Sequence, residues 1–298
     1  MRMHLLVLSL LIPAIAAGLT QHDSSQQPRD DKKAFEKFLA EPFLLGAHRG
    51  GAFVWPENTL VAFKEAAAAY PGILLEADAR LTADRHVILL HDDTVNRTTN
   101  GRGRPEEMTL AELKALDAAY NFTLDGGHTY PYRGKGVTLP TLDEVLGALP
   151  HERFQVEAKG GPELMEAIVE VVRRKNAEHR VLLCSFFPES MARLREIAPE
   201  IARTFDFVTG EELLRALREG GLDTYQPPDH VLSVMEEHLA GYGVNPGEIR
   251  AIRARGIPFQ IHTPNDEASL RKYLDWGVDS ILTDRPDLLA AILAEQKD

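Results

Sequence analysis

Short apolar runs alternate with longer amphipathic stretches along most of the chain. Glycine, proline and polar residues bound the apolar runs, as they bound buried strands, and the amphipathic stretches repeat their hydrophobic positions with the period of a helix. Strands are therefore predicted at 43–47, 73–78, 87–90, 153–156, 181–184, 201–205, 230–234, 258–261 and 280–282. Helices are predicted at 32–39, 60–70, 141–149, 162–176, 189–197, 211–219, 246–255, 267–276 and 286–295.

This order amounts to about eight strand–helix pairs in roughly 250 residues, the usual size of a (β/α)8 barrel. The predicted fold class is therefore α/β, a (β/α)8 TIM barrel. An open doubly wound sheet has the same alternation, but its ligands gather at one switch point of the strand order. Here the polar residues that could form a site follow strands throughout the chain, which favours the barrel.

Residues 93–139 interrupt the alternation. They are rich in turn-forming residues, such as Gly126-Gly127, and contain one capping box, Thr109-Leu110-Ala111-Glu112, that predicts a short helix. The stretch is too irregular for a single strand–helix unit. We therefore predict a small insertion after the second strand of the barrel.

The N-terminus has the pattern of a signal peptide. Arg2 precedes an apolar run from Leu5 to Gly18, which is too short to span a bilayer as a stable helix. Ala14-Ile15-Ala16 supplies a cleavage motif of small residues, and a polar stretch follows. We predict a signal peptide over 1–17, a linker with a short helix over 18–42 and the barrel domain over 43–298. This organisation implies a secreted or periplasmic protein with no stable membrane span.

The formal net charge of −12 limits what the chain can bind. Such an acidic chain is a poor general binder of nucleic acid or anionic membrane, so an anionic substrate needs positive charge placed locally by a metal or by basic side chains. Cys184 is the only cysteine and lies in an apolar run. The sequence therefore allows no intramolecular disulfide and predicts a buried, inert thiol.

Polar side chains follow several of the predicted strands. His48 and Arg49 follow the first strand, and Glu76 and Asp78 end the second, two residues apart and therefore on one face. The carboxyl ends of barrel strands meet at one rim, where active sites lie. We therefore expect these residues to gather with the other polar residues at strand ends, which are His91, Asp92, Glu157, Lys159, His262, Thr283 and Asp284.

The acids at this rim could form an all-oxygen metal site from Glu76, Asp78 and Glu157. Two acids on one face repel each other unless a cation lies between them, and carboxylate oxygens suit Mg²⁺ or Ca²⁺ better than Zn²⁺. The alternative is that the acids only pair with neighbouring lysine or arginine. Repetition of the pattern at Glu157-x-Lys159, on another strand end, favours the metal.

Two histidines and two basic residues complete the candidate site. His48 and His91 could act as general acid and general base, since the pKa of an unperturbed histidine is about 6.5. Arg49 and Lys159 could neutralise a phosphate, or else pair with the same carboxylates. Together with a cation, these residue types indicate phosphate-ester chemistry.

Glu57 and Asn58 begin the helix that follows the first strand. Asn58 or Thr59 can cap this helix, and capping alone explains Asn58. Glu57 could orient a histidine or an arginine of the site.

An ordered set of motifs resembles a known family. The motifs are His48-Arg49-Gly50, Pro56-Glu57-Asn58-Thr59, Glu76-x-Asp78, His91-Asp92, Arg97-Thr98-Thr99-x-Gly101, Leu139-Pro140-Thr141-Leu142, Glu157-x-Lys159 and Thr283-Asp284-x-Pro286. Each motif is weak alone, but their order is specific. From about residue 44 to its end, the chain resembles the glycerophosphodiester phosphodiesterases.

The resemblance implies a TIM barrel with a small insertion after its second strand, which matches 93–139. It implies metal ligands at Glu76, Asp78 and Glu157 with Ca²⁺ or Mg²⁺, catalytic histidines at His48 and His91, and phosphate contacts from Arg49 and Lys159. The chain departs from the family at the seventh strand, which often ends in Trp-Thr-x-Asn and here reads His262-Thr263-Pro264-Asn265. His262 replaces a tryptophan that lines the pocket, so we expect His262, with Glu57, among the substrate-binding residues.

The implied activity is metal-dependent hydrolysis of a small molecule, a glycerophosphodiester such as glycerophosphocholine or glycerophosphoethanolamine, to glycerol 3-phosphate and an alcohol. No protein partner is implied. The nearest alternative is a lysophospholipase D or sphingomyelinase D type of enzyme on the same barrel, although the 7% aromatic content shows no lipid-docking stripe. An alternative of another class is a non-catalytic protein that binds glycerophosphodiesters, which would not need two histidines for proton transfer.

Overall fold

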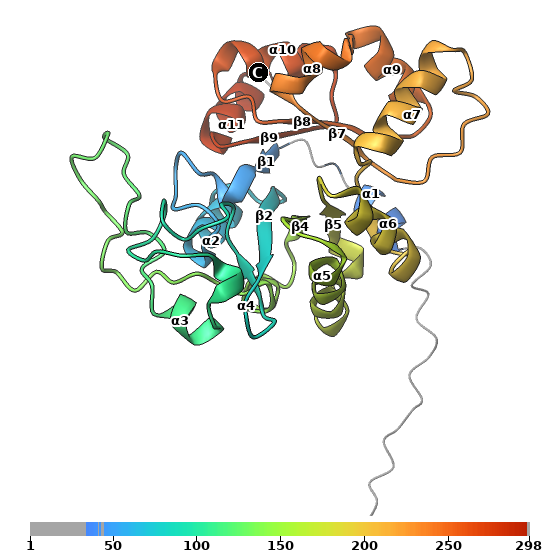
Figure 1. The fold of residues 1–298 in the computed structure, drawn as a ribbon. Helices are drawn as coiled ribbons and strands as arrows, with labels where there is room; N and C mark the ends of the chain where they lie inside the picture. The colour runs from blue at the N-terminus through green and yellow to red at the C-terminus, as the bar shows by residue number, and fades with distance from the viewer. Residues whose placement is uncertain (1–33, 41, 43–44, 297–298) are drawn as a thin grey trace, which may run out of the picture. The chain divides into compact units, whose positions relative to one another are not determined.

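The computed structural model describes residues 34–40, 42 and 45–296. In this part of the chain, eight parallel strands form one sheet (Figure 1). They follow the order β6-β5-β4-β2-β1-β9-β8-β7, so most neighbours in the sheet are also neighbours in the sequence. These strands are β1 (Leu45–Ala47), β2 (Leu74–Leu81), β4 (Arg153–Ala158), β5 (Val181–Cys184), β6 (Ala202–Arg203), β7 (Leu232–Met235), β8 (Phe259–His262) and β9 (Ser280–Thr283).

The two ends of this strand order, β6 and β7, also meet. Thr204, directly after β6, forms a parallel bridge with Val231, directly before β7. The Phe205 amide donates to the Val231 carbonyl at 3.0 Å, and the His230 amide donates to the Arg203 carbonyl at 3.1 Å. These bonds close the sheet into a barrel. The predicted (β/α)8 fold is confirmed, and the alternative prediction of an open doubly wound sheet is wrong.

Helices follow the parallel strands and pack on the outside of the barrel. Figure 1 shows α8 to α11 on one side of the strands and α4 to α6 on the other. The helices are α2 (Leu60–Ala69), α4 (Leu142–Ala148), α5 (Pro162–Arg174), α6 (Pro188–Ile197), α7 (Phe207–Arg218), α8 (Glu236–Tyr242), α9 (Pro246–Ala254), α10 (Glu267–Trp276) and α11 (Pro286–Glu295), with short 3₁₀ turns η2 (His48–Gly50) and η4 (Glu178–Arg180).

Two of these helices depart from the sequence prediction. α7 starts at Phe207 rather than Glu211, because the Asp206 carboxylate accepts a hydrogen bond from the Thr209 amide at 2.9 Å and caps the helix earlier. α8 is absent from the prediction. Its acidic start at Glu236 resembles a solvated loop, and no side-chain cap marks its beginning.

Side chains of β2 alternate between the two faces of the barrel wall. Leu75, Ala77 and Ala79 pack in the hydrophobic cluster beneath the surrounding helices. The intervening residues Glu76 and Asp78 lie on the opposite, inner face, as the two-residue period of a strand requires. The sequence of β2 therefore places both acids inside the barrel.

α1 (Ala34–Ala40) closes the amino-terminal end of the barrel. Its Phe38 is fully buried and packs in one cluster with inward-facing side chains of the barrel, which are Leu74, Leu182, Ala202, Val231 and Leu282. Leu74 is the first residue of β2, whereas Asp78 lies further toward its carboxyl end. The apolar plug and the polar rim are thus at opposite ends of the barrel.

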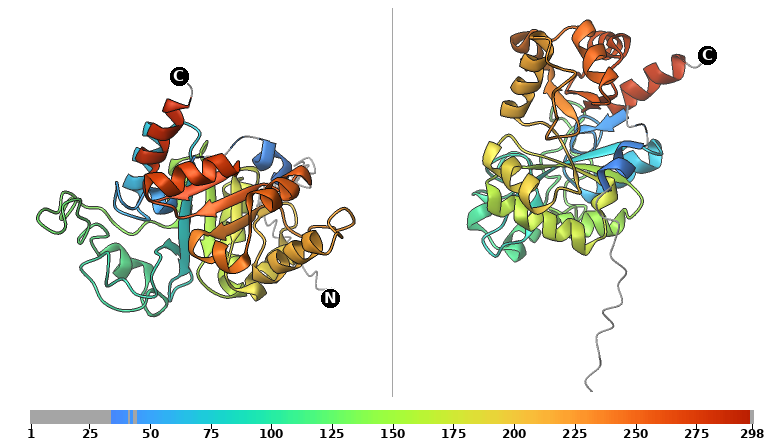
Figure 2. Two further views of the ribbon diagram at one scale, coloured as in Figure 1. Left: turned by 90° about the horizontal axis from the view of Figure 1, so that it is seen from above. Right: turned by 90° about the vertical axis from the view of Figure 1, so that its right-hand side faces the viewer.

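The residues between β2 and α4 form the predicted small insertion. β3 (Val87–Leu89) turns back antiparallel to β2, with Leu89 opposite Ala79, so the predicted strand at 87–90 is not part of the barrel wall. The rest, 93–139, holds η3 (Pro105–Glu107) and α3 (Leu110–Lys114). The whole insertion, β3 included, has its own core, which contains Ile88, Leu90, Val95, Leu113, Ala118, Ala119, Val137 and Leu139. Figure 2 shows a long loop of this region projecting away from the strands.

The predicted signal peptide, 1–17, lies outside the described residues, as does most of the predicted linker at 18–42. Within the described residues, no helix combines the length and the hydropathy needed to cross a bilayer.

Candidate active site

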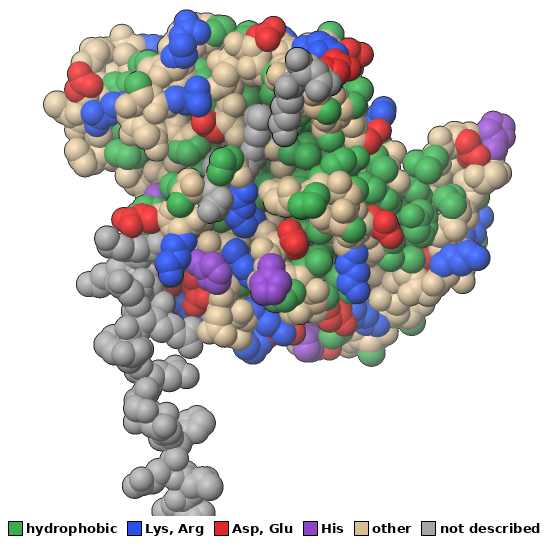
Figure 3. Space-filling view, turned by 180° about the vertical axis from the view of Figure 1, so that it is seen from behind, with side chains coloured by type: hydrophobic (Ala, Val, Ile, Leu, Met, Phe, Trp, Pro, Cys, Tyr) green, Lys and Arg blue, Asp and Glu red, His purple; other side chains and the backbone are tan. Residues whose placement is uncertain are grey.

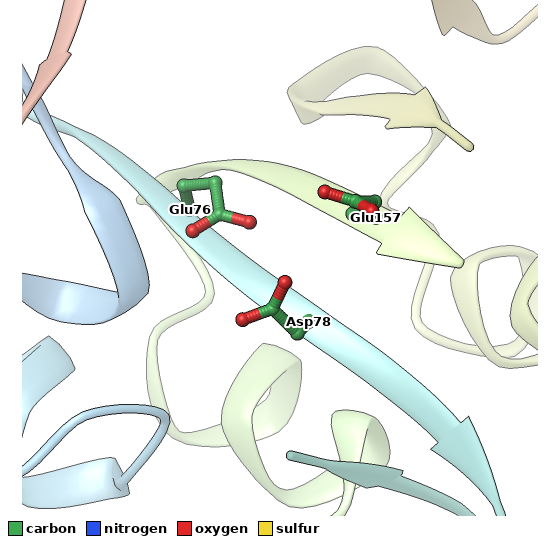
Figure 4. A group of neighbouring side chains, drawn as sticks. All are labelled: Glu76, Asp78 and Glu157. Carbon is green, nitrogen blue, oxygen red and sulfur yellow. The ribbon is translucent and has the colours of Figure 1, made fainter. Parts of the chain in front are cut away.

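Three buried carboxylates meet inside the carboxyl end of the barrel. Glu76 and Asp78 come from β2 and Glu157 comes from β4, where Asp78 and Glu157 are paired in register. One oxygen from each can be chosen so that all lie within 4.8 Å of one another. Figure 4 shows the three carboxyl groups converging from the two strands. The structure therefore brings together the three predicted metal ligands.

The carboxylates are electrostatically unequal. Burial, and then the charge of Asp78, raises the pKa of Glu76 to about 8. Burial also raises the pKa of Glu157, although the Lys159 ammonium opposes this. For Asp78 burial acts in the same upward direction, but Lys159 and Arg49 more than offset it and lower the pKa of this carboxyl. Three ionised carboxylates would carry more negative charge than Arg49 and Lys159 neutralise, and this excess, together with burial, is the reason that Glu76 keeps a proton near neutral pH.

These residues fit a hard divalent cation. In the described part of the chain, Asp78 Oδ1 and Glu157 Oε1 are buried without a well-oriented hydrogen-bond donor. The Lys159 ammonium lies 3.1 Å from the first oxygen and 2.6 Å from the second. Carboxylate oxygens that are buried, close together and short of donors are suitable ligands for Ca²⁺ or Mg²⁺. The oxygens that would bind the cation are therefore the same ones that pair with Lys159 in this structure.

Arg49 is held against the cluster by an unusual backbone. It has a φ of 54°, in the left-handed region, and Gly50 and Gly51 follow with φ of 81° and 94°. This turn lets the Arg49 amide donate to Glu76 Oε2 at 2.7 Å and places its Nε 3.4 Å from Asp78 Oδ2. The two glycines supply positive φ at little steric cost. Arg49 and Lys159 therefore lie on either side of Asp78.

His48 is oriented by a carboxylate from the other side of the barrel. Its Nδ1 lies 2.7 Å from Asp284 Oδ1, and its Nε2 lies 3.9 Å from Glu76 Oε2. Asn265 fixes Asp284 in turn, donating from Nδ2 to Oδ2 at 2.7 Å and accepting from the Asp284 amide at 2.8 Å. Burial lowers the pKa of His48, but Asp284 and Glu76 outweigh burial and raise it overall.

His91 has a matching arrangement on the insertion side. The Nδ1 atom of His91 lies 2.9 Å from Asp92 Oδ1. Arg80 Nη2 donates a hydrogen bond to the backbone carbonyl of His91 at 2.9 Å. Burial is the first cause that lowers the pKa of His91, and the charge of Lys159 adds to it. Because hydrogen bonds from Arg97 hold the pKa of Asp92 low, Asp92 is an ionised acceptor and the ring carries its proton on Nδ1. Nε2 is left to exchange protons.

Glu57 connects these two sides of the site. Its carboxylate accepts hydrogen bonds from Arg97 at 2.6 and 2.8 Å and lies 3.4 Å from Arg49 Nη1. Arg97 also donates to Asp92 at 2.7 and 2.9 Å. The expectation that Glu57 orients an arginine agrees with this geometry.

The structure decides between Asn58 and Thr59, the two residues that the sequence offered as the cap of α2. The cap of α2 is Thr59, whose hydroxyl accepts from the Ala62 amide at 3.2 Å. Asn58 instead has a φ of 54° and is buried against Asp78, donating from Nδ2 to Oδ2 at 2.8 Å and accepting from the Asp78 amide at 3.0 Å. A helix cap and a clamp on a carboxylate use the same residue type, so the sequence alone could not separate them.

His262 is the last residue of β8 and is bound to side chains of the neighbouring strand positions. Its Nε2 is 2.5 Å from Ser233 Oγ and 3.1 Å from Gln260 Oε1. Burial, and then the charges of His48 and Lys159, lowers its pKa to about 3, so the ring is neutral at physiological pH. His262 can therefore contact a substrate by packing or hydrogen bonding, but it brings no positive charge to a phosphate.

A family model described as the glycerophosphoryl diester phosphodiesterase family matches residues 48–288. The chain belongs to this family. A glycerophosphodiester phosphodiesterase of Caldanaerobacter subterraneus subsp. tengcongensis is 31% identical over 256 residues, which covers 83% of this chain and 96% of that protein. One of Bacillus subtilis (strain 168) is 29% identical over 264 residues, which covers 82% of this chain and 84% of that protein.

The structural comparison agrees. A phosphodiesterase of Oleispira antarctica, solved in complex with the product sn-glycerol-3-phosphate, matches with a TM-score of 0.68 at 25% identity and covers 85% of this chain and 97% of that chain. The predicted enzyme class, glycerophosphodiester phosphodiesterase, is confirmed.

Two recesses open beside the carboxylates in this glycerophosphoryl diester phosphodiesterase. The larger, of about 610 Å³, lies between His48, Asp284 and residues 121–126 of the insertion. Figure 3, seen from behind, shows hydrophobic side chains gathered between the projecting loop and the barrel. The smaller recess, of about 60 Å³, lies on the other side and shares Glu157 and His262 with the site. The carboxylate cluster therefore lies between two spaces of different size.

Several residues of the site are supporting partners that the strand-end rule does not single out as functional. Asp284 is one of the rim residues expected from the sequence, but its bond to His48 is not evident there. Asn265 and Arg97 belong to segments far away in sequence from the groups they hold. The only sequence signals for them are the motifs Arg97-Thr98-Thr99 and Thr263-Pro264-Asn265.

Proposed function

We propose that this chain hydrolyses glycerophosphodiesters, such as glycerophosphocholine or glycerophosphoethanolamine, to glycerol 3-phosphate and an alcohol. The proposal includes a divalent cation, Ca²⁺ or Mg²⁺, held by Glu76, Asp78 and Glu157. The observation that carries it is the convergence of these three buried carboxylates within 4.8 Å, in contact with two basic residues and one of two carboxylate-bound histidines.

Each group has a chemical task in this proposal. When bound, the cation supplies Lewis acidity toward the phosphoryl oxygens. Arg49 and Lys159 provide fixed positive charge beside the same carboxylates and stabilise negative charge on the phosphate in the transition state. Local positive charge is required here, because the chain as a whole carries a formal charge of −12.

The two histidines transfer protons. Asp284 and Asp92 hold Nδ1 of His48 and His91, so both rings exchange protons through Nε2. One ring removes a proton from the nucleophile, which is water or the 2-hydroxyl of the glycerol, and the other protonates the departing alkoxide. Attack by the 2-hydroxyl gives a cyclic phosphate that water then opens.

The Oleispira antarctica phosphodiesterase supports the product side of this proposal, since it was solved with sn-glycerol-3-phosphate. A non-catalytic binding protein is less consistent with the site, because binding alone does not require two histidines held by carboxylates.

Replacement of the histidines tests the proposal. General acid–base catalysis typically contributes about 10²–10⁴-fold, so His48→Ala and His91→Ala should each reduce glycerophosphocholine turnover by that factor while the circular dichroism spectrum stays unchanged. His151→Ala, which removes an exposed histidine before β4, is the matched control and should keep full turnover. Near-normal turnover in both His48→Ala and His91→Ala would refute the assignment.

A further inference from the structure

The smaller recess is built from residues at the carboxyl ends of β5, β6 and β7. Phe186 and Phe207 stand at its mouth, 42% and 39% exposed, with their rings stacked at a centroid distance of 5.4 Å and an interplanar angle of 22°. Two large aromatic side chains exposed together are unusual for a solvated rim and mark a place where an apolar surface is bound.

The recess is continuous with the phosphate-binding side of the proposed site. Glu157 lines both, and the Lys159 ammonium lies 5.6 Å above the Phe186 ring. A phosphate bound beside Lys159 therefore lies close to the mouth of the recess, where Phe186 stands. A substituent on that phosphate can enter it without leaving the site.

The size of the recess restricts what can enter. Its volume is about 60 Å³. At roughly 10–15 Å³ for each water-sized group, this is room for about four to six non-hydrogen atoms. A compact group therefore fits this recess, whereas a long acyl chain does not. The larger recess, of about 610 Å³, is left for the glycerol arm.

The lining restricts the chemistry as well. Apolar side chains such as Leu232, Val234 and Tyr242 form much of the wall. Two polar groups there are already paired, Ser233 with Gln260 at 2.5 Å and Ser185 with the Ala158 carbonyl at 2.7 Å. The protons of these two hydroxyls are therefore not free to bind a hydrophilic group, and Gln155 Oε1 is the acceptor of this wall that is buried without a partner among the described residues.

Charge adds a further preference. Glu211 and Glu157 are the carboxylates of the lining with no arginine partner, since Asp206 is bound by Arg195 at 2.7 Å. Aromatic faces together with acidic groups attract cations that are weakly hydrated, above all quaternary ammonium groups. Lys159 pairs with Glu157, which leaves Glu211 to provide the charge complement.

We propose that this recess binds the trimethylammonium group of a choline-type leaving alcohol, with Phe186 and Phe207 as aromatic contacts and Glu211 as the counter-charge. The inference rests on the proposed function, because it assigns the arm of the diester that leaves. It makes glycerophosphocholine a better substrate than glycerophosphoethanolamine.

The test compares kcat/KM for three diesters that differ only in the leaving alcohol. These are glycerophosphocholine, glycerophosphoethanolamine and the 3,3-dimethylbutyl ester, which has the shape of choline without its charge. We expect the wild-type enzyme to prefer the choline ester to the ethanolamine ester by about tenfold or more, with the neutral ester between them.

Two variants separate shape from charge. Phe207→Leu should reduce the choline-to-ethanolamine ratio about fivefold to tenfold while turnover of the ethanolamine ester, the internal measure of correct folding, persists. Glu211→Gln should reduce the ratio of kcat/KM for the choline ester to kcat/KM for the dimethylbutyl ester. The matched controls are Phe187→Leu and Glu212→Gln, neighbours that do not line the recess.

The outcomes are distinct. A choline-to-ethanolamine ratio near one in the wild type, or an unchanged ratio in Phe207→Leu, overturns the head-group assignment while hydrolysis itself stands. If Glu211→Gln leaves the ratio of kcat/KM for the choline and dimethylbutyl esters unchanged, Glu211 is not the counter-charge. Absence of hydrolysis of all three esters by the cation-loaded wild type overturns the proposed function itself.

Discussion

Arg97 is the residue that joins the two sides of the site. Its guanidinium donates to both oxygens of Glu57 and both oxygens of Asp92, and these acids contact Arg49 and His91. A planar guanidinium can make two such bidentate pairs, whereas an ammonium acts as a single charged point. We therefore predict that Arg97 acts on catalysis through the position of His91.

Removal of Arg97 should lower kcat more than it raises KM. Outer partners of active-site groups typically contribute about 10–100-fold, so Arg97→Ala should reduce kcat by that amount and Arg97→Lys should recover part of it. Steady-state kinetics on glycerophosphocholine measures both parameters. Arg102→Ala, an exposed neighbour, is the control. Equal kcat values in Arg97→Ala and Arg102→Ala would contradict the role.

The groups that the sequence identified are those whose position depends on one strand. His48, Glu76, Asp78 and Glu157 follow or end strands, so the barrel rule alone predicts that they gather. The supporting contacts depend on two segments at once. The bond from Asn265 to Asp284 and the clamp of Asn58 on Asp78 require a known three-dimensional pairing, and the left-handed φ of Asn58 carries no sequence signature.

At the scale of elements, α1 stabilises the barrel from the end opposite the site. Phe38 is fully buried in the cluster at that end, so Phe38→Ala should lower the free energy of unfolding by about 3–5 kcal/mol. Urea denaturation measures the loss. Turnover per folded molecule should be unchanged, because Asp78 and Glu157 lie at the other end of β2 and β4.

The control for this prediction lies on the same helix. Lys37 is exposed, so Lys37→Ala should change the free energy of unfolding by no more than about 0.5 kcal/mol. Similar stability of the Phe38→Ala and Lys37→Ala proteins would show that α1 does not support the barrel.

Elements with strong local signals were predictable. α5 has proline at its first position and a clear apolar stripe, and the prediction of 162–176 differs from Pro162–Arg174 only at its end. The antiparallel direction of β3 was not predictable. A short apolar run has the same pattern in either direction, and its pairing partner decides which one it takes. The helix α8 was not predictable either, because its local sequence signal is weak and its packing decides that it forms.

For the whole molecule, stability without a cation should depend on pH through Glu76. Its carboxyl pKa is about 8 in the fold, against 4.5 when exposed. Between these values the folded state keeps a proton that the unfolded state has released, so stability falls as pH rises from about 4.5 to about 8. One such group contributes at most about 1.4 kcal/mol per pH unit.

Chelation and addition of cation measure this effect. In EDTA, the free energy of unfolding should decline between pH 5.5 and 8, and Glu76→Gln should reduce the decline. Ca²⁺ or Mg²⁺, at a fixed concentration about 100 times its dissociation constant at pH 8, should add about 2.7 kcal/mol at that pH. It should add less at pH 5.5, where the proton on Glu76 competes with the cation, and so reduce the decline in the wild type. Glu163→Gln, at an exposed acid, is the control. A flat profile in EDTA, unaffected by cation, would exclude a metal role for the cluster.

The closure of the barrel between β6 and β7 has a consequence for local motion. β6 has two residues, and the two strands are joined through the single bridge of Thr204 and Val231 with a few flanking hydrogen bonds. A boundary with so few bonds is where a native protein opens most readily. The Phe205 and His230 amides should therefore exchange with deuterium faster than the amides between β2 and β4, measured by native-state exchange. Phe207 lines the smaller recess and follows this boundary closely, so we expect the wall of that recess to adapt while the wall that holds the carboxylates stays fixed.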